Sequence, residues 1–160
     1  MFYNENGGEG LNRKSDAIYA MLKDFKNRGV PIDGVGLQMH ISRLDYDTDA
    51  VARNIERLTK LGLQVHITEL DVSLPVASQG DAQTEDLMRQ AKIHRCSSRR
   101  HQKSWLQRHP DLGIHRQILM DWLPLHGTRG AALPFDRAYQ PKPAYQAKLK
   151  ELTSGRKATY

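Results

Sequence analysis

Two short apolar segments carry polar side chains at alternate positions near their carboxyl ends. Glu69 and Asp71 fall on one face of the later segment if it is a strand, and Gln38 and His40 fall on one face of the earlier one. An imidazole beside Glu69 could hydrogen-bond to its charged form and favour the ionised state that a carboxylate nucleophile needs. Taken alone, Glu69 could equally be a solvated acid, His40 a structural histidine and Asp71 the start of a turn.

The elements that would position these side chains alternate between helix and strand. Apolar residues at helical spacing predict helices from about Leu11 to Arg28 and from Asp47 to Gly62, and apolar runs predict strands over Gly34–His40 and Leu63–Val72. The repeat of about 30 residues is typical of parallel β/α units. By strict alternation, His66 should face away from Glu69 and pack outside the barrel core.

The pattern changes after a third helix that begins near Asp81. From Lys92 to His126 neither a helical nor a strand period is present. A strand is expected over Gly130–Asp136, and Pro143 suits the first turn of a final helix that carries Tyr145, Leu149 and Leu152.

Composition limits the classes of protein that fit. A chain of 160 residues with 39% apolar residues can form a globular domain, but a complete eight-stranded α/β barrel needs about 250 residues. No run of about 18 apolar residues predicts a membrane span. The chain's start lacks the features of a signal peptide. The single cysteine, Cys96, excludes an internal disulfide.

The net charge of +6 belongs to one segment. Residues 92–116 hold seven basic side chains against Asp111 alone, so this segment accounts for the whole excess. The basic residues are Lys92, Arg95, Arg99, Arg100, Lys103, Arg108 and Arg116. The basicity is therefore local, in the segment that has lost its periodicity.

Several segments together resemble one family. They are Asp33–His40, His66–Val72 and Gly130–Asp136 followed by Gln140–Tyr145. Their order and their Gln-x-His and Thr-Glu-Leu-Asp strands resemble the family 10 glycoside hydrolases, which are retaining endo-β-1,4-xylanases. The resemblance covers about residues 1–91 and 127–152. It implies an α/β fold, the (β/α)8 TIM barrel, of which residues 1–160 would be a partial catalytic domain: the C-terminal half, with strands five to eight and the eighth damaged.

The resemblance also implies roles for individual residues. Glu69 matches the catalytic nucleophile, and His40 and Asp71 match the pair that orients and charges it. Positions that line the sugar subsites are matched by Gln38, Tyr3 and Asn4. The family's reaction needs a second carboxyl about 5 to 5.5 Å from the nucleophile, which protonates the leaving oxygen and then activates water. The resemblance implies no cofactor and no metal.

The acid/base glutamate of the family is not expected in this chain. It lies in an Asn-Glu motif on the fourth strand, whereas Asn4-Glu5 follows a strand of the wrong repeat. General acid catalysis is worth about 10² to 10⁴ in rate, so we expect the chain alone not to hydrolyse xylan. A half barrel exposes strand edges, through which it would pair with the missing N-terminal half or with itself. The resemblance implies xylan or xylo-oligosaccharide as the substrate, no nucleic-acid or membrane partner, and an extracellular or periplasmic location.

The eighth strand of the family carries tryptophans that Leu112–Asp121 lacks. A reading frame that starts one nucleotide later encodes different residues. Met120 is encoded only by ATG and the codon of Asp121 begins with G, so the shifted codon at this point is TGG, which encodes tryptophan. Permitted codons across the stretch allow Trp-Gly-Phe-Thr-Asp-Lys-Tyr-Ser-Trp-Ile, which resembles the family motif. Our hypothesis is that residues 92–126 are translated out of frame, through a compensated pair of insertions and deletions.

Two other functions compete for the same segment. Residues 92–116, with Trp105 and Trp122 as stacking side chains, could form a basic module that binds single-stranded nucleic acid, although no recognisable motif supports it. A metal site could be built from His94, Cys96, His101 and His109, although their spacing matches no standard zinc pattern.

Overall fold

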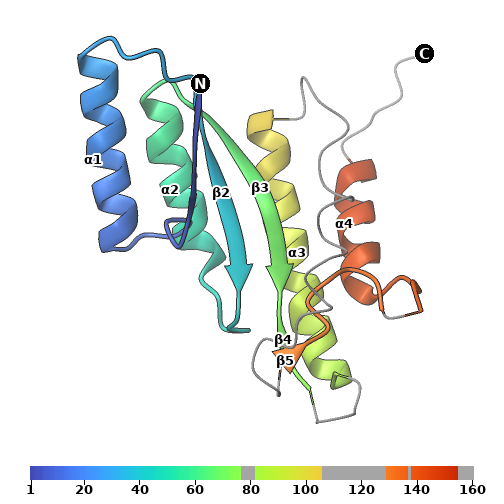
Figure 1. Cartoon of the computed structure of the whole chain (residues 1–160). Helices are drawn as coiled ribbons and strands as arrows, with labels where there is room; N and C mark the ends of the chain where they lie inside the picture. The colour runs from blue at the N-terminus through green and yellow to red at the C-terminus, as the bar shows by residue number, and fades with distance from the viewer. Residues whose placement is uncertain (77–81, 106–128, 137, 155–160) are drawn as a thin grey trace, which may run out of the picture.

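The structure, a computed structural model, describes residues 1–76, 82–105, 129–136 and 138–154. Its first half alternates strand and helix: β1 Phe2–Asn6, α1 Arg13–Asn27, β2 Gly34–Ile41, α2 Thr48–Lys60 and β3 Gln64–Val72. The three strands form a parallel sheet in the order β1-β2-β3 (Figure 1). Neighbouring parallel strands joined by helices are the β/α units that the sequence predicted.

The ends of the first two helices follow from their local chemistry. Asn12 caps α1, and its side chain and that of Ser15 bond to each other's backbone N–H in a capping box. Asp47 caps α2 through the backbone N–H groups of Asp49 and Ala50. Gly29 and Gly62 follow the helices with φ of 70° and 76°, a left-handed conformation that favours glycine. The predicted helix ends are confirmed.

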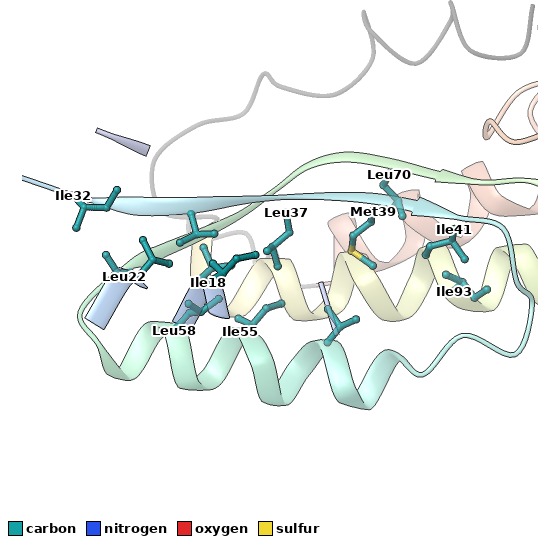
Figure 2. Packing of buried hydrophobic residues seen from close by; sticks show 14 of the residues in the cluster. Ile18, Leu22, Ile32, Leu37, Met39, Ile41, Ile55, Leu58, Leu70 and Ile93 are labelled. Atoms are coloured by element: carbon teal, nitrogen blue, oxygen red, sulfur yellow. The ribbon is translucent and has the colours of Figure 1, made fainter. Parts of the chain in front are cut away.

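Helices α1 and α2 cover one face of the sheet (Figure 2). Alternate residues of the strands supply buried apolar side chains, and the helices supply apolar stripes. This core includes Val35, Leu37, Met39, Ile41, Val65, Leu70 and Val72 from the strands, with Ile18, Leu22, Val51, Ile55 and Leu58 from the helices. The other face of β2 presents Gly34, Gly36, Gln38 and His40, so chemistry is confined to the face that the helices do not cover.

The second half contains β4 Leu74–Pro75, α3 Thr84–Trp105, β5 Arg129–Gly130 and α4 Pro143–Ser154. The expected strand over Gly130–Asp136 is wrong for most of its length: β5 pairs antiparallel to β4 at its start, and beyond it Phe135 forms a single antiparallel bridge to Pro141. Ala131 has φ of 49°, which interrupts an extended strand. The chain then runs beside β3, where the N–H of Val72 donates to the carbonyl of Ala132.

Helix α3 extends beyond the point where the sequence lost its period. Gln90, Ile93, His94 and Ser97 are buried at helical spacing along it. Only Ile93 among these is apolar, so an apolar period could not reveal the helix. The helix therefore continues to Trp105 although neither period is present in the sequence from Lys92 onward, while the proposed eighth strand at Leu112–Asp121 lies outside the described residues.

The final helix has the start that Pro143 predicted, but its apolar residues are only partly covered. Leu149 and Leu152 are 42% and 41% exposed, and Ala144 is buried.

None of the helices in the described ranges is long and apolar enough to cross a membrane.

Candidate active site

The polar side chains singled out in β2 and β3 meet at the carboxyl end of the sheet. In the register of the two strands, Gln38 pairs with Glu69 and His40 pairs with Asp71. Because parallel strands end at the same edge of a sheet, both pairs lie where the loops that follow the strands begin. The face and the end that the sequence predicted for these four residues are confirmed.

Both oxygens of Glu69 are held. The Gln38 amide Nε2 donates to Glu69 Oε1 at 2.9 Å, and His40 Nε2 lies 3.2 Å from Glu69 Oε2. The other ring nitrogen, His40 Nδ1, contacts Asp71 Oδ2. Each imidazole nitrogen therefore faces a carboxylate, so a protonated His40 can donate to both acids and a neutral one to only one of them. The arrangement fixes the orientation of the Glu69 carboxylate between Gln38 and His40.

The site is accessible. The side chains of Glu69, His40 and Asp71 are 30%, 27% and 16% exposed. A carboxylate that is held at both oxygens yet remains open on one side can attack an electrophilic carbon brought to it.

A β-bulge in β3 determines which residues share this face. Leu37 pairs with Ile67 and Gln38 with Glu69, so Thr68 is an extra residue opposite β2. An extra residue reverses the alternation on its amino-terminal side. His66, which pairs with Gly36, therefore lies on the face of Glu69, and its ring packs 4.6 Å from that of Phe2. The expectation that His66 points away from Glu69 is wrong for this reason.

Asn4 belongs to this face as well. The Thr68 hydroxyl donates to Asn4 Oδ1 at 2.9 Å, across β2. The two side chains meet over Gly36, where an added Cβ would lie 2.3 Å from Asn4 Oδ1 and 2.8 Å from Thr68 Cγ2. Sequence reasoning missed Thr68 and Gly36; the alternation of Gly34 and Gly36 is the signal that could have indicated a close approach over β2.

Tyr3 lies on the other face of β1. It pairs with buried Val35, packs against the helix-side core, and donates its hydroxyl to Glu5 Oε2 at 2.7 Å. The pKa of Tyr3 is raised, first because this bond would be lost on ionisation and then because of burial. The sheet separates Tyr3 from Glu69, because adjacent residues of a strand face opposite sides. The placement argues against Tyr3 as a sugar-lining residue.

Glu5 is on the same helix side as Tyr3. Lys14 Nζ bonds to its Oε1 at 2.9 Å, and this bond, with that from Tyr3, lowers the pKa of Glu5 to about 2. Such a carboxyl has no proton to give near neutral pH. A carboxyl in this state is unsuited to act as a general acid.

The residues of the competing metal site are only partly described. His94 lies buried in α3. His109 and the side chain of His101 fall outside the part of the chain that the structure describes. Within the part of the chain that the structure describes, no group of three or more His, Cys, Asp or Glu side chains could hold a metal ion.

Known proteins share this sequence and fold. The endo-1,4-beta-xylanase B of Thermotoga neapolitana is 36% identical over 156 residues, covering 95% of this chain and 43% of that protein. The structure of xylanase 10B from Thermotoga petrophila RKU-1 in complex with xylobiose matches with a TM-score of 0.75 and 33% identity, covering 96% of this chain and 46% of that one. The chain thus spans less than half the length of these relatives.

One relative corrects the expected location. The xylanase TsXylA of Thermoanaerobacterium saccharolyticum, which matches with a TM-score of 0.71 and 32% identity over 92% of this chain and 43% of its own, is described as intracellular. The expectation of an extracellular or periplasmic location is therefore wrong as an inference from family resemblance, since a member of the family is intracellular.

The match to a whole family is broader than these individual relatives. The sequence pattern of glycosyl hydrolase family 10 matches residues 1–151, which include all of the side chains around Glu69. With this match, the parallel β/α units and the held carboxylate at their carboxyl end, the chain belongs to glycosyl hydrolase family 10, whose fold is the (β/α)8 barrel.

Proposed function

We propose that Glu69 is the nucleophile of a retaining endo-β-1,4-xylanase. The observation that carries this proposal is the hold on both of its oxygens, by Gln38 Nε2 and His40 Nε2. Two polar contacts on its oxygens keep the carboxylate oriented for attack on a bound sugar. The names of the relatives, and the xylobiose bound to one of them, support xylan or xylo-oligosaccharide as the substrate.

The neighbours of Glu69 have separate tasks in the reaction. Glu69 forms a bond to the anomeric carbon while the glycosidic bond breaks, and the leaving oxygen takes a proton from a second carboxyl. Water then releases the sugar with retained configuration. His40 and Asp71 are positioning residues: His40 remains bonded to Asp71 when Glu69 loses its charge in the glycosyl ester, so the site keeps its shape between the two steps. Gln38 and Asn4 line the sugar subsites from the same face.

We also propose that the chain is the C-terminal half of the barrel, with β1, β2 and β3 as strands five, six and seven. Three neighbouring parallel strands in chain order, and the share of 43% to 46% of the relatives' length, support this assignment. The eighth strand would come from residues outside the described ranges. The outer edge of β1 would pair with the missing N-terminal half or, without it, with another copy of the chain.

We propose separately that residues 92–126 are translated out of frame. The α3 side chains support it. Both ring nitrogens of buried His94 and the hydroxyl of buried Ser97 have no hydrogen-bond partner among the described residues. Each such group costs about 1 to 3 kcal/mol, so this helix face is poorly suited to the interior it occupies. Sequencing the coding DNA tests the proposal, and nucleotides that cannot encode the tryptophan motif in any frame would refute it.

The experiment for Glu69 uses a complete enzyme that contains this chain with its frame restored. Glu69→Gln keeps the shape of the side chain and removes the nucleophile, so we expect release of reducing sugar from xylan to fall on the order of 10⁴-fold or more. Glu56→Gln, the same change at an exposed acid of α2, is the control and should retain full activity. Near-normal hydrolysis by Glu69→Gln would remove Glu69 from the role.

The chain alone, with its present sequence, is expected not to hydrolyse xylan. It lacks an assigned acid/base residue and the family's tryptophan motif, and its strands cannot close a barrel. Release of chromophore from an aryl xylobioside should not exceed that of a Glu69→Ala chain. A rate well above this control would show that the chain assembles a working site by itself.

A further inference from the structure

The loop that follows β1 borders the proposed site. Asn6, the last residue of β1, pairs with Gln38, which in turn pairs with Glu69. The loop of residues 7–12 therefore leaves the sheet at the level of the Gln38–Glu69 contact, two strands from Glu69. In a parallel sheet this is the end at which ligands bind.

Side chains hold the backbone of this loop at four consecutive carbonyls. Lys14 Nζ donates to the carbonyl of Asn6, and Asn12 Nδ2 donates to that of Gly7 at 3.1 Å. Asn54 Nδ2 then donates to the carbonyls of Gly8 and Glu9, at 2.8 and 2.9 Å. Asn54 is the only one of these donors that comes from α2, a different β/α unit, so it fastens the loop to the body of the domain.

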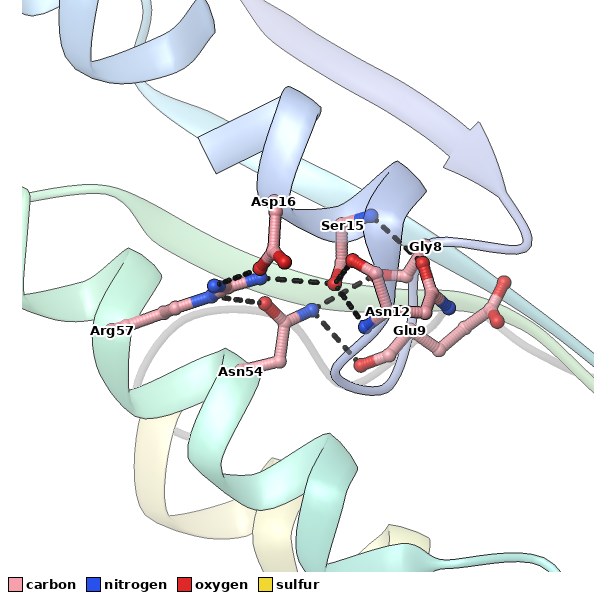
Figure 3. A network of polar contacts seen from close by, with 7 residues as sticks. All are labelled: Gly8, Glu9, Asn12, Ser15, Asp16, Asn54 and Arg57. Atoms are coloured by element: carbon pink, nitrogen blue, oxygen red, sulfur yellow. Dashed lines mark hydrogen bonds and ion pairs between the residues drawn. The ribbon is translucent and has the colours of Figure 1, made fainter. Parts of the chain in front are cut away.

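The Asn54 amide can adopt one orientation only. The residue is 1% exposed, and its Oδ1 accepts from Arg57 Nε at 2.8 Å (Figure 3). Arg57 is itself fixed, because it donates to Asp16 Oδ1 at 2.6 Å and to Ser15 Oγ at 2.9 Å. Since Arg57 can only donate, it forces the oxygen of Asn54 towards itself and the NH₂ group towards the loop.

Besides these carbonyl bonds, the loop is held by Glu9, whose Oε1 accepts from the Gly7 N–H, and has little side-chain packing at its glycines. Gly7 and Gly8 have no side chains to pack, and Gly7 has φ of 77°. Gly8 lies so close to α1 that an added Cβ would be 2.6 Å from Ile18 Cδ1. Glycine loses more conformational freedom on ordering than any other residue. An ordered loop of this composition therefore depends on bonds to its backbone, and Asn54 supplies two of them.

We propose that Asn54, oriented by Arg57, is a positioning residue that keeps the loop of residues 7–12 preformed as one wall of the sugar-binding cleft. The proposal rests on the proposed function of the Glu69 site. A preformed wall spares the ligand the cost of ordering the loop, so loss of Asn54 should weaken sugar binding without altering the bonds around Glu69.

The test measures the mobility of the loop in the chain itself by ¹⁵N relaxation. Asn54→Asp is isosteric and keeps the acceptor for Arg57, which holds the new carboxylate ionised, but it replaces two donated bonds by repulsion from two carbonyls. We expect order parameters at Gly7–Gly10 to fall from about 0.85 to below about 0.6, while those of β2 stay unchanged. Asn54→Leu should give the same result, and Arg53→Ala, an exposed neighbour on α2, should give none.

Two outcomes would overturn the proposal. One is an unchanged loop in both Asn54 variants. The other is an equal rise in mobility in β2, which would show a general structural role instead of local positioning.

Titration with xylotriose separates this proposal from the proposed function. In the complete enzyme that contains this chain with its frame restored we expect chemical-shift changes at Gln38 and Glu69 and at the loop amides, and at least fivefold weaker binding in Asn54→Asp. Changes at Glu69 without changes in the loop would overturn the role of the loop as a sugar-binding wall. The absence of any change at Gln38 and Glu69 would instead count against the proposed function, and the relaxation data would still decide whether Asn54 positions the loop.

Discussion

Buried polar side chains are bonded differently in the β1–β3 unit, residues 2–72, and in the α3–α4 pair, residues 84–105 and 143–154. In the first, the amide of buried Asn54 is bonded through both its nitrogen and its oxygen, and buried Ser15 bonds to Asn12 and Arg57. In the second, buried His94 and Ser97 have no partner among the described residues. Native interiors rarely leave such groups unbonded. At these side chains the two regions differ, and unbonded buried groups in α3 are what a local change of reading frame would produce.

Charge follows the same division. Burial lowers the pKa of His94 of α3 to about 3, with further contributions from the cations of Lys148 in α4 and of Lys142, which precedes α4. The Lys142 ammonium donates to the carbonyl of Ala131, whereas the pKa of half-buried Lys148 is lowered by loss of hydration. In the β1–β3 unit, Arg57 and Lys14 instead face Asp16 and Glu5.

The largest expected effect is a core deletion in the β1–β3 unit. Leu58 of α2 is 1% exposed, and Leu58→Ala should lower the free energy of unfolding by about 2 to 5 kcal/mol because it leaves a cavity. Leu152→Ala in α4, at 41% exposure, should cost less than about 1 kcal/mol. Urea unfolding measures both, and similar costs would contradict the contrast in packing.

Replacing the imidazole of His94, which has no hydrogen-bond partner in the part of the chain that the structure describes, should stabilise the chain. His94→Leu removes two unbonded buried nitrogens and leaves an apolar group, so we expect the free energy of unfolding to rise by about 1 to 3 kcal/mol. Lys92→Leu, at an exposed position of the same helix, serves as the control and should change it little. A loss of stability in His94→Leu would mean that His94 makes a favourable interaction after all.

The pH dependence of stability should come from the same side chain. Because the folded pKa of His94, about 3, lies below its ordinary value of 6.5, the unfolded chain binds the proton first as the pH falls. The His94 contribution is therefore unchanged above about pH 6.5 and destabilises the fold from there down to about pH 3, by up to about 1.4 kcal/mol per pH unit. Urea midpoints measured from pH 7 to pH 5 should fall less in His94→Leu than in the unsubstituted chain, and parallel curves would exclude His94 as the cause.

The smallest effect is expected from an exposed ion pair. Glu56 and Lys60 of α2 lie 2.8 Å apart, with side chains 63% and 73% exposed. Glu56→Gln should cost no more than about 0.5 kcal/mol, and less at high salt. A larger cost would show that exposed ion pairs of the β1–β3 unit contribute more to stability than the difference in packing between the two regions predicts.

Local sequence determined the elements and most of the site. The apolar stripes of α1 and α2, their caps and the glycines after them are all visible over a few residues, and so is the alternation that puts Gln38 with His40 and Glu69 with Asp71. Parallel β/α connectivity then brings the two pairs to one edge. Periodicity and connectivity are properties of the chain itself, so these predictions did not need the tertiary structure.

Only the tertiary structure decided the side on which the remaining residues lie. The bulge at Thr68, which moves His66 to the face of Glu69, exists because β3 must match β2 in register, and register depends on residues far apart in the sequence. The separation of Tyr3 from Asn4 likewise depends on which face of β1 the helices cover. The sequence did not predict α3 past residue 91 because its buried positions include Gln90, His94 and Ser97. Polar residues at buried positions do not form an apolar helical period, so only the packing of the helix against its neighbours shows which side is buried.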